Sequence, residues 1–269
     1  MKRMPQRWKP SPTIQMSFAV HGMASLAVLA TPGHWPWALG ALAANHLVLT
    51  AAGLLPRSSL LGANLNRLPA AARARREIAL TIDDGPDPEV TPRVLDLLDS
   101  AGTKASFFCI GSRARRSPAL CREIIARGHR VENHGDSHSR AFATFGPRRI
   151  GADIAAAQHT LADITGQVPR FFRPTAGLRN PLLDPVLARL DLQLASWTRR
   201  PFDGREGDPQ RVYRRLTSGL DAGDILLMHD GYAARTPTGE AVILAVLPRL
   251  LHTIAAHRLN PVTLTTALT

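Results

Sequence analysis

Two adjacent aspartates, Asp83 and Asp84, follow the apolar run Ile78–Ile82, which has the pattern of a buried β-strand. Two carboxylates side by side at a strand end repel each other unless a cation lies beside them. Gly85 and Pro86 then turn the chain sharply away from the strand. The pair therefore predicts a metal site in which one aspartate is a ligand and the other acts as a base, although Asp-Asp-Gly also occurs in ordinary turns.

His134 and His138 lie four residues apart, just after a second apparent strand end at Arg130-Val131. On a helical turn this spacing places both imidazoles on one face, as a divalent metal requires. Together with one aspartate they make a three-ligand set that leaves positions open for water and substrate, which suits hydrolysis. A single histidine pair is also common on protein surfaces, and this chain has 10 histidines.

Two further polar residues follow apolar strands. Arg173, which precedes Pro174, can form a fixed bidentate pair with a carboxylate. His229 ends the run Ile225–Met228, and a histidine in that position can act as a general acid near neutral pH. Taken singly, each also fits an ordinary role: Arg173 on the surface, and His229 in the core or as a cap.

From Glu77 onward, short apolar runs alternate with amphipathic stretches. The expected strands are Ile78–Ile82, Ala105–Ile110, Arg170–Phe172, Leu192–Ser196, Ile225–Met228 and Pro261–Leu264. The expected helices are Val90–Ser100, Pro118–Ala126, Arg148–Ile164, Asp208–Leu220 and Glu240–His257. This alternation predicts an α/β fold with a parallel sheet, open or closed into a barrel. Because chemistry in such folds lies at the carboxyl ends of the strands, the polar residues above should meet at one rim.

The aspartate pair, the histidine pair, Arg173-Pro174 and His229 follow one another in the chain. In this order they resemble the motifs of the polysaccharide deacetylase family (carbohydrate esterase family 4, the chitooligosaccharide-deacetylase-like domain) over residues 77–269. Thr81–Gly85 is similar to the first motif and His134–His138 to the second. Arg173-Pro174 is similar to the start of the third motif, and Leu227–His229 to the fifth. The resemblance implies a distorted barrel of parallel strands with helices outside, usually with fewer than eight strands.

The resemblance also implies a division of labour. Asp84, His134 and His138 would hold a divalent metal, commonly zinc. Asp83 would be the base that takes a proton from water at the metal, and Arg173 would orient Asp83.

The remaining implied roles concern the acyl group. His229 would protonate the leaving amine, and Leu227 would help to line the pocket for the acetyl methyl group. The metal and a backbone N–H near Ala176 would stabilise the oxyanion.

The chain departs from the family pattern in two places. Thr175 and Ala176 stand where the third motif normally has proline and an aromatic residue, so stacking on a sugar is lost while a backbone donor survives. Trp197, expected in the pocket wall, lacks the neighbouring aspartate of the fourth motif. Asp203 is the candidate carboxylate that tunes His229. These departures bear on the substrate more than on the reaction.

The N-terminal region has a different composition. Two apolar stretches, about Ile14–Ala30 and Trp35–Leu55, each approach the ~20 residues that cross a bilayer. The turn Pro32–His34 separates them. We predict a helical hairpin over residues 1–56 that forms a two-span membrane anchor, then a basic linker over 57–76 and the catalytic domain over 77–269. A soluble hairpin that caps the domain is the alternative.

Charge indicates the orientation of the hairpin and its neighbours, and the cysteine content bears on disulfides. Basic residues flank both outer ends of the hairpin and none lies between the spans, so the positive-inside rule places both ends, and the catalytic domain, on the cytoplasmic side of a bacterial cytoplasmic membrane. The net charge of +12 favours anionic neighbours such as lipid head groups or phosphorylated substrates, or is only a solvated face, and no nucleic-acid partner is expected. The two cysteines make no disulfide framework, and Cys109 should be buried.

Three functions fit these features. The first is a metal-dependent hydrolase that removes an N-acyl group, such as acetyl, from an amino sugar of a cell-envelope glycan. The second is deacetylation or deformylation of a lipid-linked sugar at the membrane, which the hairpin, the basic linker and the missing aromatic favour. The third is an inactive barrel that binds glycans or acts as a scaffold. The complete set of acidic and histidine residues argues against the third.

Overall fold

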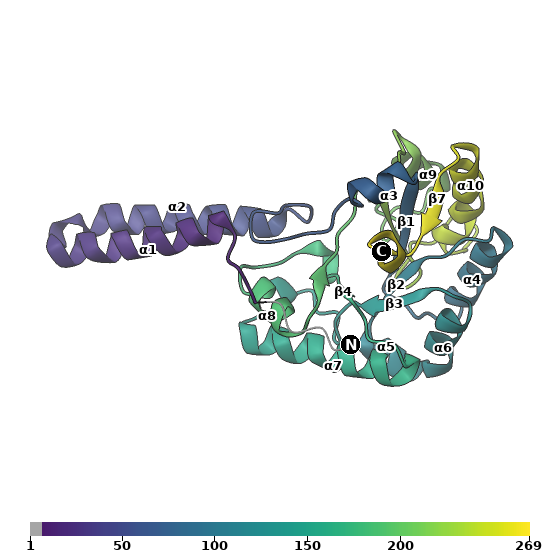
Figure 1. Cartoon of the computed structure of the whole chain (residues 1–269), viewed down its shortest axis with the longest axis horizontal. Coiled ribbons are helices and arrows are strands. Elements are labelled where there is room, and N and C mark those ends of the chain that lie inside the picture. The colour runs from purple at the N-terminus through teal and green to yellow at the C-terminus, as the bar shows by residue number, and fades with distance from the viewer. Residues whose placement is uncertain (1–6) are drawn as a thin grey trace.

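A computed structural model describes residues 7–269. It contains a curled parallel sheet wrapped by helices, from which a helical hairpin projects to one side (Figure 1). The predicted fold class, a distorted α/β barrel of parallel strands preceded by an N-terminal helical hairpin, is therefore confirmed.

The sheet has seven strands, all paired in parallel, in the order β5-β4-β3-β2-β1-β6, with β7 beside the start of β1. They are β1 (Glu77–Asp83), β2 (Ser106–Cys109), β3 (Arg130–Asn133), β4 (Phe171–Phe172), β5 (Gln193–Leu194), β6 (Ile225–His229) and β7 (Asn260–Val262). Beyond β5 the chain forms a parallel bridge from Arg199 to Leu226 of β6. The two ends of the sheet thereby approach each other, which curls it toward a barrel.

Alternation along the strands decides which side chains face the inside of the curl. In β1, Ile78, Leu80 and Ile82 pack in the core beneath the outer helices, whereas Ala79 belongs to a separate inner cluster. Since successive side chains of a strand point to opposite faces, Thr81 and Asp83 share the inner face with Ala79. The same alternation in β6 places Ile225 and Leu227 inside. His229 therefore reaches the inner rim as well.

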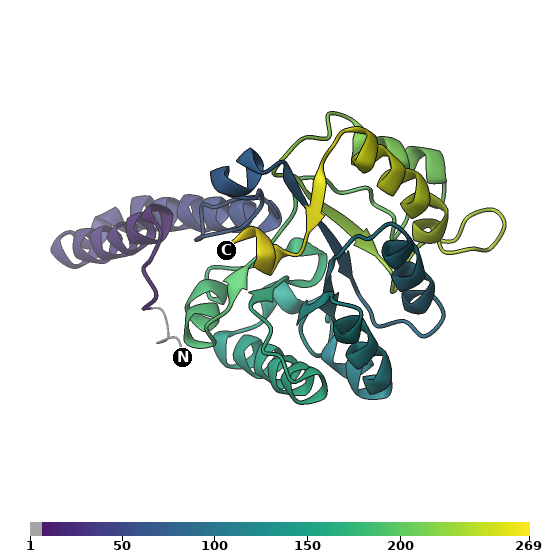
Figure 2. The same ribbon diagram turned by 45° about the vertical axis from the view of Figure 1, so that its right-hand side comes forward.

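The helices after the hairpin are α3 (Ala70–Ala74), α4 (Thr91–Ser100), α5 (Gly111–Arg116), α6 (Pro118–Ala126), α7 (Pro147–Thr165), α8 (Leu183–Arg189), α9 (Pro209–Thr217), α10 (Val242–Ala256) and α11 (Leu264–Ala267). Most of them cover the outside of the sheet (Figure 2), whereas α3 and α11 pack against the inner cluster. The five expected helices are present, and α3, α5, α8 and α11 are too short to be recognised by periodicity. The expected strand at Pro261–Leu264 extended past the observed end of β7 at Val262. The Thr263 hydroxyl accepts a hydrogen bond from the Thr266 N–H and so starts α11.

The N-terminal hairpin consists of α1 (Pro12–Ala30), the short turn η1 (Pro32–His34) and α2 (Trp35–Leu54). Both long helices are long and apolar enough to cross a membrane. Their apolar side chains largely face outward: Leu29 is 80% exposed and Trp37 is 82% exposed. Between the helices, the Asn45 side-chain amide donates a hydrogen bond to the Ser17 hydroxyl (2.9 Å).

The segment between the hairpin and β1 packs closely on the domain. Leu61, Leu68 and Ala72 are buried in it, and Leu65 forms a parallel bridge with Ala195. Although this segment is basic as predicted, it is folded against the barrel and does not hang free. The base of the hairpin is consequently held against the barrel.

Candidate active site and metal centre

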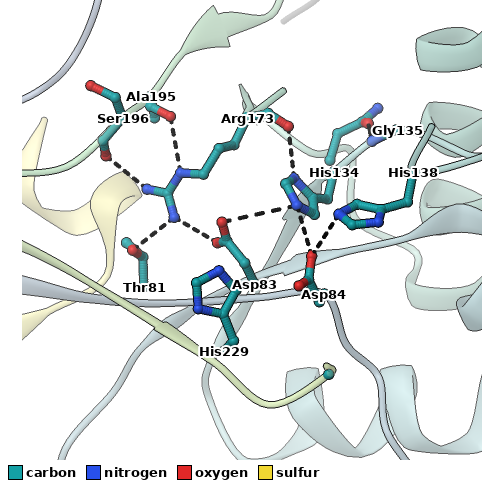
Figure 3. Close-up of polar contacts among 12 residues, drawn as sticks. Thr81, Asp83, Asp84, His134, Gly135, His138, Arg173, Ala195, Ser196 and His229 are labelled. Carbon is teal, nitrogen blue, oxygen red and sulfur yellow. Dashed lines mark hydrogen bonds and ion pairs between the residues drawn. The ribbon is translucent and has the colours of Figure 1, made fainter. Parts of the chain in front are cut away.

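Five polar residues from four strands meet at the rim formed by the carboxyl ends of the strands (Figure 3). Asp83 ends β1 and Asp84 follows it, His134 follows β3, Arg173 follows β4, and His229 ends β6. Parallel strands present these ends on the same side of the sheet, so residues up to about 145 positions apart in the chain become neighbours.

Asp84, His134 and His138 form a compact group of potential metal ligands. The Asp84 Oδ1 atom lies 3.0 Å from the His134 Nε2 atom and 2.9 Å from the His138 Nε2 atom. The three ligand atoms all lie within 4.8 Å of one another. Burial by itself would raise the pKa of Asp84, but hydrogen bonds from both histidines lower it far below its ordinary value, so this carboxylate carries a negative charge.

The chemistry of this group fits a divalent cation. The His134 Nδ1 atom lies 2.7 Å from the Arg173 carbonyl oxygen, where it must donate its proton. In the neutral ring the Nε2 atom then has only a lone pair, and it points at a carboxylate oxygen. Two acceptors facing each other at this distance need a proton or a metal between them. A backbone carbonyl that orients a histidine ring in this way is typical of metal centres.

The segment from His134 to His138 is a loop, so the expectation of a helical turn was wrong. Gly135 (φ 75°) and His138 (φ 49°) adopt left-handed backbone conformations that reverse the chain. The Asp153 carboxylate accepts hydrogen bonds from the N–H groups of Asp136 and Ser137, both at 3.1 Å. These side-chain acceptors replace the carbonyls that a helix would supply, and the loop still brings the two imidazole centres to 5.1 Å.

Asp83 is held by the fully buried side chain of Arg173. The Arg173 Nη1 atom donates to the Asp83 Oδ1 atom at 2.6 Å and to the Thr81 hydroxyl at 2.9 Å. The rest of the guanidinium donates to the carbonyl oxygens of Ala195 (3.1 Å) and Ser196 (2.8 Å). Because all three nitrogen atoms of the guanidinium have acceptors, its position is fixed. Asp83 therefore keeps one orientation, with its Oδ2 atom 4.0 Å from the His134 Nε2 atom.

His229 forms a pair with Asp203, the carboxylate that sequence reasoning had selected for it. The Asp203 Oδ1 atom accepts from the His229 Nδ1 atom at 2.7 Å, and its Oδ2 atom accepts from the His229 backbone N–H at 2.8 Å. Burial lowers the pKa of His229, but the charge and hydrogen bond of Asp203 outweigh this and raise the pKa to about 9. The imidazole is therefore protonated at neutral pH.

The residues expected around the acyl group occupy different depths. Ala176 is exposed, and its backbone N–H donates to no group within residues 7–269. Leu227 and Trp197 belong to the buried inner cluster beneath the rim. The six-membered ring of Trp197 lies so close to Gly177 that a β-carbon there would collide with it. Trp197 thus supports the loop that carries Ala176.

Backbone strain is concentrated at this rim. Eight non-glycine residues among those described have positive φ, and five of them lie here: Asp84 (76°), His138 (49°), Ala176 (57°), Phe202 (62°) and Tyr232 (53°). Such conformations cost free energy and cluster at functional sites. Phe202 and Tyr232 could not be identified from the sequence because both lie on irregular loops. The Tyr232 ring stacks on His138, with ring centres 5.6 Å apart.

The fold and this site define a parallel α/β barrel with an aspartate–histidine–histidine centre. The polysaccharide deacetylase family profile matches residues 70–195. A peptidoglycan-N-acetylglucosamine deacetylase of Bacillus cereus is 33% identical over 175 residues, which cover 64% of this chain and 81% of that protein. A chitooligosaccharide deacetylase of Bradyrhizobium sp. is 31% identical over 61% of this chain and 74% of its own length. The chain belongs to the polysaccharide deacetylase family, as its motifs had indicated.

A solved structure agrees with this assignment. The crystal structure of the peptidoglycan N-acetylglucosamine deacetylase Bc1960 superposes with a TM-score of 0.68 and 25% identity, over 76% of this chain and 92% of that one. The part of this chain left over is comparable in length to the N-terminal hairpin and the segment that follows it.

Proposed function

We propose that this chain is a metal-dependent hydrolase that removes an N-acyl group, acetyl in the first instance, from an amino sugar of a cell-envelope glycan. One observation carries the proposal: a carboxylate fixed by a buried arginine and an imidazole with a raised pKa lie beside the aspartate–histidine–histidine group (Figure 3). The relatives named above, which act on peptidoglycan or chitooligosaccharides, support the class of substrate.

Asp84, His134 and His138 are the residues that would hold the ion, which we take to be zinc. When bound there, a divalent cation polarises the acyl carbonyl and makes water more acidic. Asp83 takes the proton from the attacking water, and Arg173 keeps the free Oδ2 atom turned toward the metal ligands.

The acid side of the reaction belongs to His229. Since Asp203 occupies its Nδ1 atom, the Nε2–H remains for the leaving amine, and a pKa of about 9 keeps that proton in place at neutral pH. The free N–H of Ala176 donates to the oxygen on which negative charge develops. Leu227 limits the pocket for the acyl methyl group, which lets a small acyl group enter.

For the organisation of the chain, we propose that residues 1–56 anchor the protein in a bacterial cytoplasmic membrane and that residues 77–269 are the catalytic domain. Residues 1–6 of this anchor lie outside the described part of the chain. Two apolar helices with exposed side chains support the anchor, and the absence of Lys and Arg between them favours cytoplasmic ends. A reporter fused to the C-terminus should read cytoplasmic, and a periplasmic reading would overturn this orientation.

A second candidate is the same reaction, deacetylation or deformylation, on a lipid-linked amino sugar. The contact between the hairpin base and the site favours it: the β-carbon of Pro56, two residues after α2, lies against Gly177, beside Ala176.

Release of acetate or formate distinguishes these candidates. Full-length protein in detergent should be tested on chitooligosaccharides, peptidoglycan fragments and lipid-linked amino sugars, with the metal-free protein as control. Acetate from the first two substrates supports the first candidate, and product from the third alone supports the second. A metal-loaded, folded protein that releases neither acid from any substrate would leave the inactive barrel as the answer.

A further inference from the structure

Arg200 lies beside the candidate site on the segment that closes the barrel between β5 and β6. Its guanidinium carbon is 5.1 Å from the Trp197 ring centre and 5.0 Å from the Phe202 ring centre. The neighbouring residue Arg199 pairs with Leu226, so the backbone of this segment is fixed. Two aromatic rings therefore hold a half-buried guanidinium in a defined position at the rim.

Among the residues that the structure describes, this guanidinium has no carboxylate partner. Within residues 7–269 no ion pair includes Arg200, and its buried Nε atom has no hydrogen-bond acceptor. The buried arginine at the same rim, Arg173, has by contrast acceptors for all three of its nitrogens. A partly desolvated donor without an acceptor costs free energy, which a ligand with anionic oxygens would recover.

Arg200 is also close to the reacting groups. The guanidinium carbon of Arg173, which holds Asp83, lies 5.7 Å from the centre of the same Trp197 ring that Arg200 contacts. Asp203, which pairs with His229, follows Phe202 on the same segment as Arg200. Those two carboxylates are already engaged, Asp83 with Arg173 and Asp203 with His229. A ligand held by Arg200 would consequently lie next to the base and the acid.

The other edge of Trp197 connects this position to the hairpin. The Trp197 ring and Pro56 both pack against Gly177, and the Arg57 Nη1 atom donates to the Thr198 carbonyl at 3.1 Å. Leu54 and Leu55, at the end of α2, are exposed apolar residues. A short series of contacts thus joins the apolar hairpin, two arginines and the catalytic residues.

From these contacts we propose that the substrate is a phosphorylated amino sugar and that Arg200 binds its phosphate group. The planar donor fork of arginine matches phosphate oxygens, which a neutral glycan does not offer. This inference rests on the proposed N-deacylation and specifies its substrate class. A soluble sugar phosphate and a phosphate that joins the sugar to a lipid share this chemistry, and the position of Arg57 beside the hairpin favours the lipid-linked form.

The test compares three substrates on full-length, metal-loaded protein in detergent micelles: N-acetylglucosamine, its 1-phosphate, and a long-chain alkyl ester of that phosphate. We expect kcat/KM for acetate release to be at least about tenfold higher for the two phosphates than for the neutral sugar. Arg200→Gln should reduce this preference by about tenfold, and Arg200→Lys, which keeps the charge without the fork, should restore part of it. Arg122→Gln, which changes an exposed arginine on α6, is the matched control.

Equal kcat/KM for neutral and phosphorylated sugars, or a preference that Arg200→Gln leaves unchanged, would overturn the inference while N-deacylation stands. A further gain for the alkyl ester would identify the lipid-linked form, and equal rates for both phosphates would show that phosphate alone is recognised.

Complete absence of acetate would instead refute the proposed function. The phosphate site would then be judged by calorimetry with N-acetylglucosamine 1-phosphate: a Kd about tenfold weaker in Arg200→Gln supports it, and an equal Kd or no binding refutes it. Circular dichroism establishes that each variant is folded.

Discussion

The barrel rim and the hairpin differ in which side chains they bury: the rim buries charged groups, and the hairpin exposes apolar ones. At the rim, charged side chains are buried or nearly so. Asp83 is paired with Arg173, Asp84 with His134, and His229 with Asp203. In the hairpin, large apolar side chains are exposed and a few polar ones form a seam between the helices. Polar groups at the rim are therefore paired away from water, whereas the hairpin leaves large apolar side chains uncovered by the rest of the described chain.

The largest expected effect tests the cation at the rim. Asp84→Ala or His138→Ala should remove bound metal and abolish acyl release, because two ligands leave the site incomplete. Elemental analysis should find about one divalent ion per chain in the unmodified protein and none in these variants. A folded, active native protein without metal would refute the assignment.

Asp83→Asn sharpens the division between the two aspartates. It should retain the metal and lower kcat by about 10²–10⁴-fold, as loss of a general base does. Elemental analysis and steady-state kinetics on the same preparation give both readings. Unchanged turnover would exclude Asp83 as the base.

The hairpin side of the comparison is tested by one exposed residue near the middle of α1. Met23→Arg places a charge where we expect the bilayer core, at a cost of about 2.5–3.5 kcal/mol. Flotation with lipid vesicles should show weaker membrane association, while Met23→Leu should behave as the original. Full solubility of the unmodified chain without detergent would favour the soluble hairpin instead.

The pH dependence of the reaction tests the pair of Asp203 and His229. Activity should fall as pH rises through about 9, where His229 loses its proton. In Asp203→Asn the largest contribution that raises this pKa is gone, so the alkaline limb should move to lower pH, toward the ordinary histidine value of about 6.5. A kcat–pH profile that is identical in both proteins would show that His229 is not the acid.

The smallest effect concerns the seam in the hairpin. Asn45→Ala removes the hydrogen bond to Ser17, and such bonds between helices in a membrane contribute about 0.6 kcal/mol. Denaturation in detergent micelles should show a loss of this size. A loss several times larger would indicate that the seam has a role beyond holding α1 to α2.

The sequence by itself determined the fold class, the family and the set of residues that gather at the rim. Asp83, Asp84, His134, Arg173 and His229 could be located because each follows an apolar strand and parallel strands bring such ends together. The two apolar helices could likewise be bounded to within a few residues by composition. The chemical roles of these residues remain predictions.

Only the tertiary structure decided how the rim is completed. The loop at His138 and the positions of Phe202 and Tyr232 depend on left-handed backbone conformations, and Phe and Tyr carry no local signal for them. The contact of Pro56 with Gly177 joins segments far apart in the chain. Hydrophobic periodicity predicts which face of a helix or strand is buried. Loops have no such periodicity, so contacts between them cannot be predicted in this way.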